Sequence, residues 1–148
     1  MSNLPLIIAI GLIGGIAIGV QAPMAAIMGE RVGPLESVFF VHIGGAIVVG
    51  LLLIFFAGGK LDEWQQVPWW AWLAGSMGVI AVSSTIFMVP RIGVGGAIVL
   101  IIAGQLLIAA VIDHFGWMGV DTTPLTWQRT MGLGLVLLGA WFAVRGAG

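Results

Sequence analysis

Hydrogen-bonding side chains are scarce in the long apolar runs of this sequence. In an apolar environment such groups need partners, and amides, hydroxyls and an imidazole can bind neutral or weakly polar ligands. If successive runs cross a membrane in alternating directions, four of them place such groups in the same half of the membrane or near its middle. This indicates a shared polar pocket that opens toward that side. The candidate substrate-binding residues are Gln21, His42, Ser83, Ser84 and Gln105.

One histidine is the only ionisable residue well inside an apolar run, His42. Histidine gains and loses protons near neutral pH, so His42 is a candidate for proton coupling. Asp113 and His114, at the border of a run, are the two other candidates. A neutral His42 bonded to a backbone carbonyl is an equally open interpretation. No Asp, Glu, Lys or Arg lies deep in a run, which favours a neutral, amphiphilic or weakly charged substrate over a strongly cationic one.

Each of these residues also has a purely structural interpretation. Serine and threonine in apolar helices often bond the carbonyl four residues earlier. Amides such as Gln21 and Gln105 can hold helices together instead of binding a ligand.

The composition places these residues in lipid. The chain has 148 residues, of which 60% are hydrophobic and 7% charged, with a mean hydropathy of +1.17. Soluble domains carry charge at roughly a quarter of their positions. With no cysteine and a net charge of −1, the chain offers neither thiolate metal sites nor a basic surface for nucleic acid.

The runs predict an all-α, polytopic protein with about five transmembrane helices in a single domain, 1–148. Continuous apolar runs near the ~20 residues of a membrane-spanning helix favour helices over strands. Tryptophans cluster at the predicted ends, where their rings favour the membrane interface. The expected helices are 4–28, 35–57, 68–89, 95–112 and 126–144.

Basic residues are balanced between the two sides of the membrane. With five spans, the N-terminal side holds Lys60 and Arg129, and the other side holds Arg31, Arg91 and Arg145. Because Lys/Arg asymmetry sets orientation, this balance leaves dual insertion and a single orientation as about equal alternatives.

Glycine spacing predicts where helices pack. Gly11, Gly15 and Gly19 form consecutive G-x-x-x-G steps, a close-approach face. Near the C-terminus, Gly132, Gly134 and Gly139 are a candidate dimer seam.

Catalytic motifs are weak. Residues 75–78 lack the first glycine of a nucleophile elbow, and Asp113 with His114 matches no metal spacing. We therefore expect a protein that is not an enzyme and needs no cofactor or metal.

Several motifs resemble the YdcZ-like inner-membrane proteins of the drug/metabolite transporter (DMT) superfamily. They are Gly19-Val20-Gln21, Trp72 to Gly75 with Gly78, Pro90 to Gly93, Gly104-Gln105, Asp113 to Gly116, and Arg129 with Gly132 and Gly139. The resemblance covers nearly the whole chain. It implies a five-helix half-transporter of the inner membrane, related to the small multidrug resistance fold. Such halves pair as homodimers, typically antiparallel, or as heterodimers with a paralogous chain, with the substrate path between protomers.

Departures from the family pattern concern polar positions. This chain has Ala25 and Ala109 where the family often has Asn and Ser, and Gly75-Ser76 where it has paired glycines. We expect a small-molecule membrane transporter, an exporter that acts as a dimer of five-helix protomers with the substrate path between them. The alternative is a non-transporting membrane subunit, or a lipid-binding module, whose polar residues only hold helices together.

Overall fold

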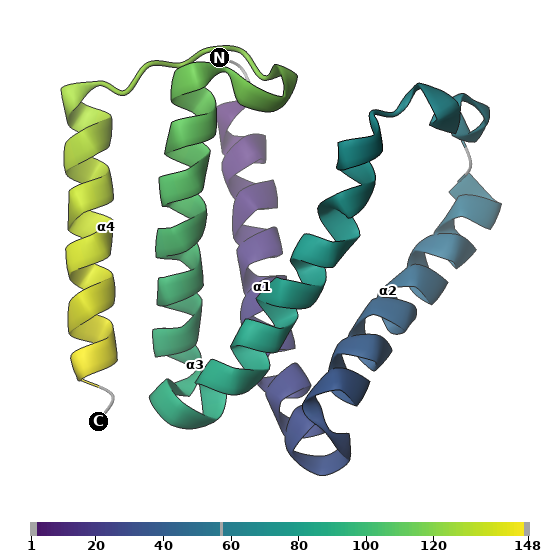
Figure 1. Ribbon diagram of the computed structural model, residues 1–148, viewed down its shortest axis with the longest axis horizontal. Coiled ribbons are helices and arrows are strands. Elements are labelled where there is room, and N and C mark those ends of the chain that lie inside the picture. The colour runs from purple at the N-terminus through teal and green to yellow at the C-terminus, as the bar shows by residue number, and fades with distance from the viewer. Residues whose placement is uncertain (1–2, 57, 147–148) are drawn as a thin grey trace. The chain divides into compact units, whose positions relative to one another are not determined.

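The computed structural model describes residues 3–56 and 58–146 and divides the chain into two compact units, Met1–Phe87 and Met88–Gly148. All regular structure in the described residues is helical, which confirms the predicted all-α class. The elements, in chain order in Figure 1, are α1 (Leu4–Val32), α2 (Pro34–Phe56), the 3₁₀ helices η1 (Leu61–Gln66) and η2 (Trp69–Leu73), α3 (Ala74–Phe115), the 3₁₀ helix η3 (Trp117–Gly119) and α4 (Trp127–Arg145).

Three described segments are long and apolar enough to cross a membrane: Leu4–Val32, Pro34–Phe56 and Trp69–Phe115. The third has 47 residues. A straight helix of that length would extend about 70 Å, roughly twice the hydrocarbon thickness, so it has the length for two crossings. The count of five spans stays a prediction, and the predicted end of the second helix at residue 57 lies outside the described residues.

α3 combines two predicted helices around a break at Gly93. Its backbone there has φ 71° and ψ 168°, a conformation open essentially only to glycine. The break falls between the predicted ranges 68–89 and 95–112. Pro90 lies inside the helix, so the interruption comes three residues after the proline.

In the first unit, α1 and α2 are joined by a turn of one residue, Gly33. Its φ of 111° favours glycine, and a side chain there would meet the Glu36 carboxylate. The backbone N–H of Ser37 donates to the Gly33 carbonyl at 3.0 Å. This turn sets the two helices against each other near their junction.

Small residues let the helices of the first unit approach closely. Ala22, Ala25, Ala26 and Gly29 are the buried residues of α1. They share one helical face, because they are spaced by three and four residues. A Cβ at Gly29 would lie 2.6 Å from Ile86 Cγ2, and the buried cluster is formed by Ala25, Val38 and Ile86.

The glycine steps of α1 are not the site of this approach. Gly11, Gly15 and Gly19 have no atom within 4 Å of a built Cβ. That these three glycines form a close-approach face stays a prediction. Alanine, like glycine, lets helices approach closely. A search for the G-x-x-x-G pattern does not find these alanine positions.

In the second unit, the last part of α3 is followed by η3, and α4 returns in the opposite direction (Figure 1). Thr126 caps α4, since its side chain accepts a hydrogen bond from the Arg129 backbone N–H. An N-cap threonine satisfies one of the unpaired N–H groups of a first helical turn. The cap fixes where α4 begins, one residue after the predicted start at 126.

Candidate functional site

A groove between α1 and α2 lies beside the candidate residue Gln21, and we call it the α1–α2 groove. It has a volume of about 510 Å³ and is largely open. It is lined by Ala17, Val20, Gln21, Met24, Ala25, Met28, Val41, Gly44 and Gly45. Gln21 is the one residue of this lining with a polar side chain, and none of the lining carries a charge.

The composition of this groove follows from the packing of the two helices. Gly44 and Gly45 leave open space on α2, with no atom within 4 Å of a built Cβ. Met24 and Met28 form the wall opposite, and unbranched methionine adapts to ligands of different shape. Apolar walls with one amide suit an amphiphilic molecule with a single polar group.

Gln21 also lines a small cavity on the other side of α1, together with Thr85 of α3. The cavity holds about 20 Å³, enough for one water molecule. Thr85 is 8% exposed, and its hydroxyl donates to the Ala81 carbonyl at 2.9 Å. Its oxygen can still accept a hydrogen bond. Thr85 could not be preferred over its neighbours Ser83 and Ser84 from the amino-acid pattern alone.

His42 is oriented by its own helix. Its Nδ1 lies 2.8 Å from the Val38 carbonyl. A carbonyl oxygen only accepts, so Nδ1 carries the hydrogen in this contact and Nε2 is the basic nitrogen of the neutral ring. Nε2 would lie 3.1 Å from a Cβ at Gly78, so the basic nitrogen faces α3.

Ser83 and Ser84 bond backward along α3. Their hydroxyls donate to the carbonyls of Val79 and Ile80, at 2.8 and 2.9 Å. This is the structural interpretation of serine in an apolar helix. Both oxygens remain acceptors, so a ligand could donate to them but would not receive a hydrogen from them. Their role in substrate binding stays a prediction.

Gln105 lies in the second unit, on the part of α3 after the break, with an exposed side chain. The first unit gathers Gln21, His42, Ser83 and Ser84, on α1, α2 and α3. That Gln105 joins them in one pocket stays a prediction.

Ser37 is a buried polar residue that the sequence reasoning missed. It is 0% exposed, and its hydroxyl donates to the Ala25 carbonyl of α1 at 2.8 Å. It stands only three residues after Pro34, in the first turn of α2, where a polar residue looks like an ordinary helix start. Its contact with α1 depends on the tight Gly33 turn, for which Gly33-Pro34 was the available signal.

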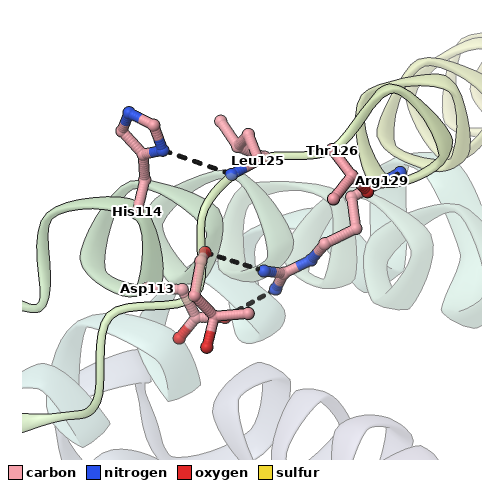
Figure 2. A network of polar contacts seen from close by, with 6 residues as sticks. Asp113, His114, Leu125, Thr126 and Arg129 are labelled. Atoms are coloured by element: carbon pink, nitrogen blue, oxygen red, sulfur yellow. Dashed lines mark hydrogen bonds and ion pairs between the residues drawn. The ribbon is translucent and has the colours of Figure 1, made fainter.

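Asp113 and Arg129 form an ion pair that joins the end of α3 to the start of α4 (Figure 2). Arg129 Nη2 donates to Asp113 Oδ2 at 2.6 Å, and Nη1 donates to the Thr123 carbonyl at 3.0 Å. The Thr123 N–H donates in turn to the Asp113 carbonyl at 2.7 Å. The connection between the helices is thus held from both sides by one arginine and one aspartate.

His114 belongs to the same connection. The Leu125 N–H donates to His114 Nδ1 at 3.2 Å, as Figure 2 shows. Here Nδ1 is the acceptor, the reverse of its role in His42. A proton on His114 Nδ1 would abolish this bond, whereas Nε2 of His42 can take a proton with its bond to Val38 intact.

The glycines predicted as a dimer seam stand in open space. Gly132, Gly134 and Gly139 on α4 have no atom within 4 Å of a built Cβ. Their role in assembly stays a prediction.

One family model matches the chain, with the description "Putative inner membrane exporter, YdcZ", over residues 6–142. Neither the curated proteins nor the solved structures gave a match. The match covers α2, α3 and most of α1 and α4, and it includes the residues of the α1–α2 groove. It agrees with the long apolar helices of the described residues. It also places the protein in the inner membrane. The chain belongs to the YdcZ family of inner membrane exporters within the drug/metabolite transporter group.

Proposed function

We propose that the protein exports a neutral, amphiphilic small molecule, which it binds in the α1–α2 groove with Gln21 as the polar contact. The observation that carries this proposal is the lining of the groove, apolar throughout except for one amide. An amide offers both a donor and an acceptor without a charge. A substrate with one polar group and an apolar body satisfies both parts of the groove.

The uncharged lining also bears on which substrates the groove would bind. A cation in this groove would lose hydration and find no carboxylate, a large cost in an apolar medium. Gly44 and Gly45 provide room, and the two methionines provide adaptable walls. We infer that the groove selects molecules mainly by size and discriminates little between their functional groups.

His42 is the candidate we favour for proton coupling. Its Nε2 is the basic nitrogen of the neutral ring and lies at the α2–α3 contact. Asp113 is engaged with Arg129, and His114 uses its Nδ1 to hold the loop. Protonation of either would first break a contact that joins the two ends of the loop, so neither matches His42 as a proton carrier.

A pair of protomers would complete the transporter. Balanced Lys and Arg residues and the open glycine face of α4 support an assembly in which two chains, of opposite orientation, enclose the substrate path. Alternating access would then follow from rocking of one protomer against the other. Because the chain has no cysteine, a single Gly134→Cys variant gives a clean cross-linking probe of a symmetric α4 contact.

Reconstitution in proteoliposomes tests the binding role of Gln21. Gln21→Leu should lower the rate of export of a neutral amphiphilic dye by about tenfold, in line with one buried hydrogen bond left unmade. Gln65→Leu, which removes an exposed amide from the loop, should leave the rate unchanged. Wild-type export by the Gln21→Leu variant would contradict the proposal. Weaker assembly with an unchanged ligand affinity would instead favour a role for Gln21 in holding helices together.

A further inference from the structure

The connection between α2 and α3 carries a second groove, distinct from the α1–α2 groove, which we call the loop groove. It has a volume of about 500 Å³ and is largely open. It is lined by Lys60, Leu61, Glu63, Trp64, Gln66, Val67, Pro68 and Trp72. Charged and apolar groups therefore meet in one opening.

The position of this loop in the chain fixes its surroundings. It connects two segments that are long and apolar enough to span the membrane, Pro34–Phe56 and Trp69–Phe115, so residues 58–68 and the start of the second segment lie near a membrane surface. Its apolar side chains remain exposed in the chain itself, notably Leu61, Trp64 and Trp72. Indole rings favour the headgroup level of a bilayer, where one edge is wet and the other apolar.

The charged edge of the groove is organised by the first 3₁₀ turn. The Glu63 N–H donates to the Lys60 carbonyl at 3.1 Å, and Lys60 Nζ lies 2.8 Å from Glu63 Oε1. An ammonium has three donors, and a carboxylate has a second oxygen. Each partner can therefore bind a further group without breaking the pair, and a positive and a negative charge stand next to each other at the opening.

The aromatic edge is formed by Trp64 and Trp72, whose rings meet edge to face with centroids 6.3 Å apart. Val67 and Pro68 continue this apolar surface. Indole faces attract ammonium groups, most strongly where water is partly excluded. An ammonium between Glu63 and an indole face would receive attraction from both.

We propose that the loop groove binds the headgroup of a zwitterionic phospholipid. The ammonium of the headgroup lies against the Glu63 carboxylate and the two indoles, and its phosphate lies against the Lys60 ammonium. The start of the acyl chains follows Val67 and Pro68. Charge complementarity selects this occupant, since an anionic lipid without an ammonium would satisfy Lys60 and meet Glu63 with like charge. The site is independent of the substrate role given to the α1–α2 groove.

Native mass spectrometry of the protein, released from nanodiscs of phosphatidylethanolamine and phosphatidylglycerol in equal amounts, tests this site. We expect the wild type to retain phosphatidylethanolamine preferentially. Glu63→Gln and Lys60→Gln should each lower that retention about two- to fivefold, the range for one exposed ionic contact. Asp62→Asn is the matched control, because Asp62 is in the same 3₁₀ helix and does not line the groove.

The aromatic edge has its own control. Trp72→Leu should lower retention, whereas Trp69→Leu should not, because Trp69 is exposed on the same loop outside the groove. The proposal is overturned if the wild type retains both lipids equally. It is also overturned if Asp62→Asn loses as much lipid as Glu63→Gln, or Trp69→Leu as much as Trp72→Leu. Displacement of the lipid by an exported dye would assign the groove to substrate instead and would also overturn it.

Discussion

Nε2 of His42 lies 3.1 Å from the position that a Cβ at Gly78 would occupy. The contact brings a titratable ring on α2 against a backbone position on α3 that has no side chain. Because Nδ1 is bonded to Val38, the ring cannot turn away without losing that hydrogen bond. The bond to Val38 orients the ring, and the absence of a side chain at residue 78 leaves room for its basic nitrogen.

Gly78→Ala should displace the His42 ring, since 3.1 Å is tighter than ordinary van der Waals contact. We expect altered ¹⁵N shifts of the His42 ring and a flattened pH profile of export. Gly75→Ala is the matched control, because nothing lies within 4 Å of its built Cβ. Equal His42 spectra for the two variants would contradict a contact between residue 78 and the His42 ring. If Gly78→Ala shifts the His42 signal but export by the wild type does not depend on pH, the contact is supported and proton coupling by His42 is contradicted.

Gly45→Leu should fill the α1–α2 groove. No atom lies within 4 Å of a Cβ at this position, so the new side chain enters the groove without a clash and the fold should be retained. Binding of a neutral amphiphilic dye should weaken by tenfold or more, about 1.4 kcal/mol or greater. Gly50→Leu, on the same helix and outside the groove lining, is the comparison. Equal dye affinity in both variants would place the substrate elsewhere.

Asp113→Asn should loosen the connection between α3 and α4. The ion pair with Arg129 has both side chains 37% exposed, so its contribution is at most about 1 kcal/mol. Hydrogen exchange at the Thr123 and Leu125 amides should accelerate by up to about fivefold. The exposed Asp121, replaced by Asn, serves as the reference. Unchanged exchange at both amides in the Asp113 variant would show that the pair does not hold the loop.

Ser37→Ala should destabilise the junction of α1 and α2. The variant removes the one donor to the Ala25 carbonyl from α2 at a site of 0% exposure. Hydrogen bonds between membrane helices contribute about 0.6 kcal/mol on average, and about 1 kcal/mol is expected here. Thermal unfolding in detergent measures the loss. Ser76→Ala, an exposed serine on α3, should have no effect, and equal stability of the two variants would contradict the assigned role of Ser37.

The amino-acid pattern by itself determined the class of the protein and the residues worth attention. Long apolar runs have one physical solution in lipid, because every backbone polar group must be bonded within the segment. Scarcity also singled out Gln21 and His42, since a polar side chain in such a run has few partners. The motifs around Gln21, Pro90, Gln105 and Asp113 pointed to the family that the comparison then matched.

The tertiary structure decided what each polar residue contacts. Ser83 and Ser84 bond their own helix, and Ser37 bonds a neighbour. The positions alone do not separate these outcomes, because any hydroxyl can do either. The difference depends on which helix lies within about 3 Å, and that depends on the turn at Gly33 and the small residues around Ala25. Contacts between residues distant in the chain arise only when helices pack, so Asp113 with Arg129, and His42 with Gly78, could be identified only from the folded chain.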